Sequence, residues 1–168
     1  CHMAEDIWQN IPYQIEEESV FLRGWPKSPV SWKNNSLVKP INELRLLRVS
    51  INRVIEGCRN SQEIGASLEA AIRIDIKSPA LKNASEMLRN QGDPEVDILR
   101  DWLLVSQLQI GGEPWAEVLA NHEDENYLIE VARARGRKCD RCWHYFVNNF
   151  EDGKIDQLCN RCENVIKN

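Results

Sequence analysis

The sequence predicts an α+β fold that ends in a small metal-binding ribbon. Three patterns support this expectation: apolar residues recur at helical spacing over residues 41–59, several shorter segments alternate like strands, and two Cys-x-x-Cys pairs lie near the C-terminal end. A chain of 168 residues that is 42% apolar and 28% charged can form one ordinary domain or two small ones.

The N-terminal part is expected to be a short helix followed by irregular chain. Apolar spacing indicates a helix over residues 4–11, and the prolines and paired asparagines of residues 12–40 argue against regular structure there. Pro40 is expected to open the long helix over residues 41–59, and glycines to end it. We expect its apolar face to lie in the core. Its other face could instead follow a phosphate backbone through Arg45, Arg48, Arg53 and Arg59.

The middle of the chain indicates a small α+β unit. Alternating apolar residues predict strands over residues 68–77, 103–110 and 127–135. Helical spacing predicts short helices over residues 79–91 and 94–100, separated by a Gly-Asp-Pro break.

Charge and hydropathy limit the class of protein. The net charge of −5 argues against a chain that binds nucleic acid over its whole surface. The charge is uneven, however, because residues 133–168 carry eight basic and five acidic side chains. A basic end on an acidic body is compatible with contact to a polyanion, although charge alone favours a merely solvated surface. No apolar run approaches the roughly 18 residues of a membrane span, and no signal peptide is visible.

The N-terminal residues suggest a piece of a longer protein. The chain opens on Cys1-His2-Met3 and enters a helical pattern without a cap, so these residues are either native or an expression scar.

The cysteines carry the most specific signal in the sequence. Four of the six form the pattern C-x2-C-x16-C-x2-C, while Cys1 and Cys58 stand alone. This clustering favours a reducing compartment and a metal site over a disulfide framework. Two Cys-x-x-Cys knuckles give a tetrahedral shell of four sulfurs that suits one zinc ion, and a closed shell is structural rather than catalytic. The predicted ligands are Cys139, Cys142, Cys159 and Cys162.

Residues around the knuckles add weaker hypotheses. Arg141 and Arg161 occupy matching places, which suggests pseudo-symmetry. His144 is not needed as a ligand because four sulfurs complete the shell. Trp143 is expected to form a small core for the ribbon, with base stacking as the alternative. No phosphate-binding loop, nucleotide fingerprint or nucleophile–base pair is evident, so no catalytic residue is predicted.

The chain resembles the C-terminal end of bacterial-type isoleucyl-tRNA synthetases. The closest match is Lys138-Cys-Asp-Arg-Cys-Trp-His-Tyr145 followed by Cys159-Asn-Arg-Cys162, which is similar to the family's terminal zinc ribbon. Ala4-Glu-Asp-Ile-Trp8, Ser19-Val-Phe-Leu-Arg-Gly-Trp-Pro26 and Ile64-Gly-Ala-Ser-Leu-Glu-Ala70 are similar to the segments that precede it, so the resemblance covers nearly the whole chain.

The resemblance implies a division of the chain into three parts. Residues 1–40 would be the end of a helical anticodon-binding bundle and a linker, residues 41–135 a small α+β junction domain, and residues 136–168 the zinc ribbon.

The resemblance also implies a function. The full enzyme is a cytoplasmic ligase that joins isoleucine to its tRNA using ATP, and its catalytic and editing domains lie outside this sequence. We therefore expect an inactive, monomeric fragment that holds one structural zinc, contacts the remaining synthetase domains and binds the anticodon side of the tRNA. The expected tRNA contacts are Arg133, Arg135, Arg137, Lys138, Arg141 and Trp143.

Two alternatives come from other functional classes. A similar ribbon closes the Fpg-type DNA glycosylases, where it contacts duplex DNA, but there a glycine usually occupies the place of Trp143. The third interpretation is a zinc-stabilised protein-interaction module that binds no nucleic acid.

Overall fold

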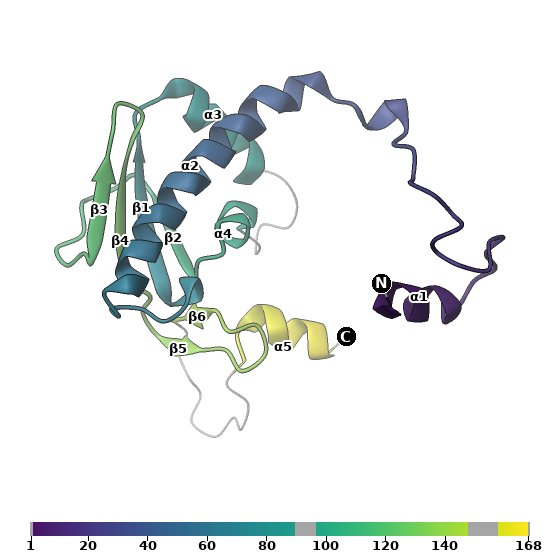
Figure 1. Ribbon diagram of the computed structural model, residues 1–168. Coiled ribbons are helices and arrows are strands. Elements are labelled where there is room, and N and C mark those ends of the chain that lie inside the picture. The colour runs from purple at the N-terminus through teal and green to yellow at the C-terminus, as the bar shows by residue number, and fades with distance from the viewer. Residues whose placement is uncertain (1, 90–96, 148–157, 168) are drawn as a thin grey trace. The chain divides into compact units, whose positions relative to one another are not determined.

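The computed structural model describes residues 2–89, 97–147 and 158–167 (Figure 1). The chain separates into two compact units, Cys1–Asn35 and Ser36–Asn168, each of which is described by itself. Within the described residues, no helix has the length and apolar character needed to cross a membrane. The division at residues 40 and 135 stays a prediction.

The first unit consists of a short helix and the loop that folds back onto it. Helix α1 (His2–Gln9) lies close to the predicted bounds. The indole of Trp8 donates to the Glu17 carbonyl at 3.0 Å, and the Glu5 carboxylate accepts from the Ser19 hydroxyl at 2.8 Å. A single 3-10 turn (Val30–Trp32) interrupts the rest of the loop. The unit leaves several large apolar side chains exposed, namely Tyr13, Phe21, Leu22, Trp25, Val30 and Trp32.

The long helix α2 (Asn35–Asn60) begins earlier than the sequence predicted. Pro40 lies inside the helix rather than at its start. Because proline has no N–H, α2 lacks one backbone hydrogen bond near its beginning. No glycine ends the helix, because Gly57 is within it and the left-handed residue is Gln62, with φ of 60°. Gln62 N–H donates to the Arg59 carbonyl and Glu63 N–H to the Cys58 carbonyl, which is a Schellman motif.

The second unit is built on a four-stranded sheet in the order β2-β1-β4-β3. The strands are β1 (Ala70–Ile76), β2 (Gln107–Ile110), β3 (Ala120–Glu123) and β4 (Tyr127–Arg133), and a 3-10 turn (Ser67–Glu69) precedes β1. Strands β1 and β2 are parallel, whereas β4 is antiparallel to both β1 and β3. Helices α3 (Pro79–Arg89) and α4 (Ile98–Leu103) belong to the crossover between the two parallel strands.

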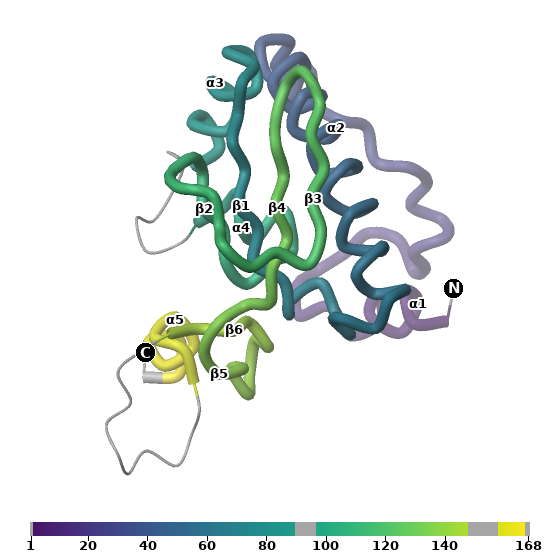
Figure 2. The backbone as a smooth tube through the Cα atoms, turned by 90° about the vertical axis from the view of Figure 1, so that its left-hand side faces the viewer, coloured from purple at the N-terminus to yellow at the C-terminus, as the bar shows by residue number. Residues whose placement is uncertain are grey.

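One face of the sheet carries the core, and none of the described helices covers the other face. Helices α2, α3 and α4 lie on the same side of the sheet in Figure 1, and Figure 2 looks onto the opposite side. The core side packs fully buried aliphatic residues from the helices against the strands, including Leu47, Ile51, Leu99, Ile72, Ile129 and Val131. The helix-free side is formed by the alternate strand positions.

The structure corrects one strand prediction and adds a strand that was not predicted. Residues 103–110 begin in a helix, since α4 runs to Leu103 and Leu104 closes it in the left-handed conformation. The Asp97 carboxylate caps the start of α4 by accepting from Arg100 N–H at 3.1 Å. Part of the helix predicted over residues 94–100, and its Gly-Asp-Pro break, lie outside the described residues. Strand β3 was not predicted, because Ala-Asn-His-Glu has no apolar alternation.

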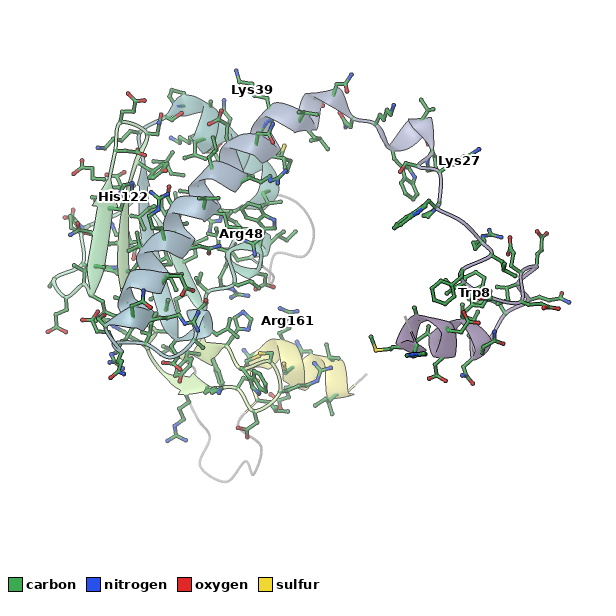
Figure 3. All side chains as sticks on the ribbon, in the orientation of Figure 1. Trp8, Lys27, Lys39, Arg48, His122 and Arg161 are labelled. Atoms are coloured by element: carbon green, nitrogen blue, oxygen red, sulfur yellow. The ribbon has the colours of Figure 1, made fainter. Side chains whose placement is uncertain are left out.

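The C-terminal ribbon docks onto the body of the same unit. It contains the two-stranded sheet of β5 (Arg137–Lys138) and β6 (Tyr145–Phe146), and helix α5 (Asn160–Lys167). Tyr145 N–H donates to the Ser106 hydroxyl at 2.7 Å. Arg161, which Figure 3 labels, lies on α5. Its guanidinium donates to the Asp101 carboxylate of α4 at 2.8 Å. These polar contacts fix the ribbon beside the end of the sheet.

Candidate metal centre and its surroundings

The structure brings the four predicted cysteines together. Cys139 and Cys142 lie between β5 and β6, Cys159 immediately precedes α5, and Cys162 is in its first turn. All four Sγ atoms lie within 4.8 Å of one another, and those of Cys142 and Cys159 are 3.6 Å apart. Cys139 and Cys162 are buried, while the other two are half-buried. This cluster can hold a metal ion.

The geometry fits a tetrahedral zinc ion. Zinc–sulfur bonds of about 2.3 Å in a tetrahedron place the sulfurs about 3.8 Å apart. The separations in the cluster span this value, with 3.6 Å for one pair and none above 4.8 Å. Because every donor is a thiol, the set also matches the preference of zinc for soft ligands.

The protein environment shifts the pKa values of three of the thiols in different directions. Burial by itself raises the pKa of Cys139, but the backbone N–H groups of Cys142, Cys159 and Arg141 donate to its sulfur and lower its pKa to about 6. Burial raises the pKa of Cys142 to about 12 and also raises that of Cys159. A metal ion that takes all four sulfurs must therefore displace protons, which makes metal affinity dependent on pH.

The two knuckles differ in structure despite their matching sequences. The first continues into a residue in the left-handed conformation, Trp143, with φ of 64°, whereas the second continues into helix α5. The arginines differ as well. Arg141 Nη1 lies 3.7 Å from the Cys162 sulfur, and Arg161 pairs with Asp101 instead. Pseudo-symmetry therefore does not extend to the arginine contacts.

Trp143 does not form the expected small core of the ribbon. Its side chain is 60% exposed, and its ring lies 5.2 Å from the ammonium of Lys138. Glycine would adopt the left-handed backbone at this position without strain. A bulky residue here stores strain, which often marks a functional position.

His144 is not part of the sulfur cluster. It is half-buried, and its Nε2 lies 3.7 Å from the Asp101 carboxylate. Burial is the largest cause that lowers the pKa of His144, and the neighbouring Arg100 lowers it further. Its backbone carbonyl accepts from Cys139 N–H at 2.9 Å, so the residue helps to close the first knuckle.

The predicted basic residues are exposed along one continuous segment. Arg133 ends β4, Arg135 follows it, and β5 carries Arg137 and Lys138. The backbone of Arg135 is held by the Gln107 side chain, which accepts from its N–H at 3.0 Å and donates to its carbonyl at 2.8 Å. The six predicted tRNA contacts thus form a path from the end of the sheet to the metal cluster.

The basic face of α2 is partly engaged within the protein. Arg48 stacks on the Trp102 ring of α4 at 5.0 Å (Figure 3), and Arg59 pairs with Glu56 at 2.7 Å. Sequence reasoning missed Trp102 and Trp115 as side chains that position arginines or loops. In the sequence, each of them is only a tryptophan near turn-forming residues, and this pattern is too general to identify a partner.

Comparisons with known proteins give a consistent result. A family model described as the anticodon-binding domain of tRNA ligase matches residues 1–75. The isoleucine–tRNA ligases of Parasynechococcus marenigrum (strain WH8102), Prochlorococcus marinus (strain MIT 9211) and Synechococcus sp. (strain CC9311) are 60%, 58% and 56% identical to this chain. Each similarity covers 99% of this chain and 17% of the relative. The chain therefore spans about 17% of the length of these curated relatives.

Proposed function

We propose that the chain is a C-terminal part of an isoleucine–tRNA ligase and that it binds the anticodon side of the isoleucine tRNA around one structural zinc ion. The observation that carries the proposal is the joint presence of an anticodon-binding match and a four-sulfur cluster at the end of a basic, exposed path. Similarity over 99% of the chain, ribbon included, favours this function over a DNA glycosylase or an interaction module.

Zinc is the metal that we propose for Cys139, Cys142, Cys159 and Cys162. The ribbon's described strands contain only two residues each, so apolar burial alone provides little stability. Metal binding would supply most of the folding free energy of this part. Its role would be to hold β5, β6 and the start of α5 in the arrangement that presents the basic side chains.

The proposed RNA contacts have two chemical roles, phosphate binding and base stacking. Arg133, Arg135, Arg137, Lys138 and Arg141 would contact phosphates, which position an RNA without reading its sequence. Trp143 would stack on an unpaired base, as aromatic residues do in single-stranded RNA recognition. Its exposure supports this role, because the ring is not buried in a core of the ribbon.

The remaining activities would belong to the longer protein. Aminoacylation with isoleucine and ATP, and editing, would be functions of its other domains, and the chain alone would be inactive. The exposed apolar side chains of the first unit, such as Trp25 and Trp32, would contact those domains. We place the monomeric protein in the cytoplasm, because cysteines clustered at a metal site favour a reducing compartment.

Binding titrations test this function. The chain would be titrated at low salt with isoleucine tRNA, with the same tRNA carrying a swapped anticodon, and with duplex DNA. We expect preference for the cognate tRNA, and we expect Arg137→Ala with Lys138→Ala to weaken binding and flatten its salt dependence by about one unit of slope per lost phosphate contact. Lys82→Ala is the matched control, because this exposed lysine lies on α3 at the other end of the sheet from the ribbon (Figure 1).

Two results would contradict the proposal. Equal affinity for all three nucleic acids would leave only generic phosphate binding. An unchanged salt slope in the double variant would show that the basic path is a solvated surface.

A further inference from the structure

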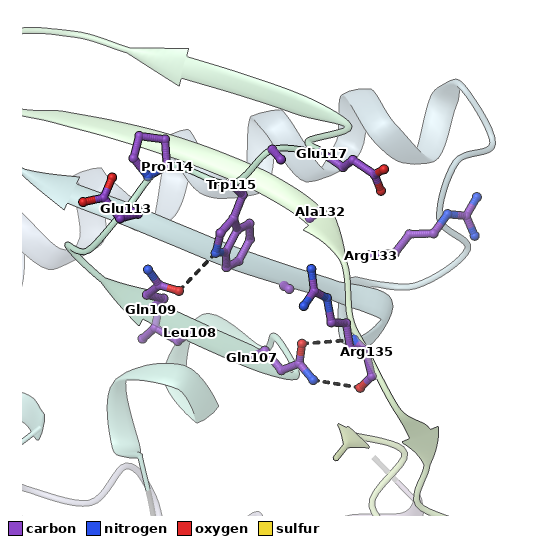
Figure 4. A pocket seen from close by; sticks show the side chains of 12 residues that line it. Gln107, Leu108, Gln109, Glu113, Pro114, Trp115, Glu117, Ala132, Arg133 and Arg135 are labelled. Carbon is purple, nitrogen blue, oxygen red and sulfur yellow. Dashed lines mark hydrogen bonds between the residues drawn. The ribbon is translucent and has the colours of Figure 1, made fainter.

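The helix-free face of the sheet carries a pocket that shares only Arg133 and Arg135 with the predicted tRNA contacts. Its volume is about 780 Å³, within the range of ligand-binding pockets. It lies between strands β2, β1 and β4 and the loop that follows β2 (Figure 4). The residues that matter most for its chemistry are Gln107, Gln109, Trp115, Arg133 and Arg135.

Small residues form the floor of the pocket. Ala71 of β1 lies directly opposite Ala132 of β4, and both line the pocket. The next pair, Ile72 and Val131, points to the other face and belongs to the core. Since large β-branched residues are preferred in strands, two facing alanines leave a hollow where side chains would otherwise meet.

The wall of the pocket is Trp115, and a chain of hydrogen bonds fixes it. Its indole N–H donates to Gln109 Oε1 at 3.0 Å, and its backbone N–H donates to Glu130 Oε2 at 3.4 Å. The same carboxylate accepts from Arg73 at 2.8 Å, and Arg73 also donates to the Gly112 carbonyl at 2.7 Å. The ion pair is almost fully buried, with 3% and 10% of the two side chains exposed.

This network positions the loop, because a buried ion pair by itself is weak evidence for stability. Gly111 and Gly112 turn the chain back over the sheet with φ of 69° and 77°, which most residues cannot adopt cheaply. Trp115 therefore stands over the pocket in one defined orientation before any ligand arrives. Such preorganisation reduces the entropy cost of binding.

The charges around the pocket point to a particular ligand. Arg133 and Arg135 are exposed, and neither guanidinium makes an ion pair or hydrogen bond with the part of the chain that the structure describes. Glu113 and Glu117 also line the pocket (Figure 4), so a polyphosphate would be repelled. A single nucleotide matches these groups. Its flat heterocycle can lie on the Trp115 indole, and its N–H groups can donate to the two glutamates. Its one phosphate can bind the two arginines.

We propose that the Trp115 pocket binds one unpaired nucleotide of the tRNA, with its base on the indole and its phosphate on Arg133 and Arg135. The proposal rests on the proposed function and adds a second base-stacking site to it. Arg135 lies just before Arg137 and Lys138 of β5, so the same RNA strand passes from the pocket to the ribbon. A single chain segment thus carries the phosphate contacts of both sites.

The test measures isoleucine tRNA binding by the whole chain carrying changes in the pocket. Trp115→Ala is expected to weaken binding by about 5-fold to 150-fold, the effect of losing one stacked base. Trp115→Phe retains an aromatic face and should bind within a few-fold of the original chain. Arg133→Ala with Arg135→Ala should weaken binding and lower the salt slope, by about 0.7 units per phosphate contact on a single strand.

Controls separate the possible failures. Zinc content and far-UV circular dichroism must be unchanged in each variant, and Lys82→Ala should bind as the original chain does. If Trp115→Ala disturbs the fold, Trp115→Leu decides, because leucine fills part of the space but offers no aromatic face. The arginine pair cannot decide alone, since Arg133 and Arg135 are phosphate contacts of the proposed function as well. Unchanged affinity in a folded Trp115→Ala or Trp115→Leu variant would overturn the proposal, even if the arginine pair weakens binding, and would leave the pocket to a protein segment. Absence of tRNA binding by the original chain would overturn the proposed function as well.

Discussion

The Arg73–Glu130 pair gives the sharpest test of how the second unit is built. Glu130→Gln keeps the side-chain size but removes the charge that compensates Arg73, whose side chain is 3% exposed. Removing one partner of a buried pair typically costs about 3–5 kcal/mol. We expect a value near the lower end, about 3 kcal/mol, because the Gly112 carbonyl and the new amide oxygen still accept from the guanidinium.

Urea unfolding followed by circular dichroism measures this cost. With a slope of about 1.5 kcal/mol per molar urea, the midpoint should fall by about 2 M. The double change Arg73→Met with Glu130→Leu removes both charges and should recover most of the stability, since apolar replacement of such a pair is often neutral. A single variant within about 0.5 kcal/mol of the original chain, or a double variant as unstable as the single one, would refute this reasoning.

Three further predictions concern the metal cluster and two turns. Cys142→Ser should release zinc and expose residues 136–168 to protease, whereas Cys58→Ala, which changes a buried cysteine outside the cluster, should retain one zinc per chain by metal analysis. Gly136→Ala should also lose zinc, because the φ of Gly136 is 95° and an added Cβ would collide with the Phe146 carbonyl. The control Gly57→Ala lies inside α2 with open space around it, and it should instead raise the unfolding free energy by about 0.5–1 kcal/mol. Asp124→Ala should cost about 1 kcal/mol at pH 7 in urea titrations, because its carboxylate accepts from Asn126 and Tyr127 N–H at 2.7 and 3.0 Å. Burial raises the pKa of Asp124, but these N–H donors outweigh it and lower the pKa, so the native state loses this stabilisation as pH falls through the lowered value, and the difference between variant and original should shrink below about pH 4.

The metal cluster was predictable because its information is local. Each Cys-x-x-Cys pair fixes two sulfurs within one turn, and the four sulfurs then meet within 4.8 Å. The long amphipathic helix was predictable for the same reason, since its spacing alone placed Leu44, Leu47 and Ile51 in the core. The helix start was not, because proline is expected in the first turn of a helix, whereas α2 begins at Asn35, five residues before Pro40.

Features that depend on distant parts of the chain were missed or misread. The apolar run Trp102-Leu-Leu-Val105 suits either a strand or a helix by periodicity, and the Asp97 cap decided for helix α4. Arg73 does lie on the polar face of β1, as its alternation predicted. That face is nevertheless covered there by the loop after β2, so the charge is buried against a partner 57 positions away. No pattern in the loop itself indicated that it would fold over the sheet.

The positions of two tryptophans are not explained by stability alone. Trp143 keeps a left-handed backbone that glycine would adopt without strain, and its ring contributes little to packing at 60% exposure. Trp115 is held over a hollow by a buried ion pair that an apolar pair could replace at little cost in stability. Stability alone favours neither arrangement. A ligand with unpaired bases accounts for both, because a stacking surface must be exposed and fixed before the base arrives.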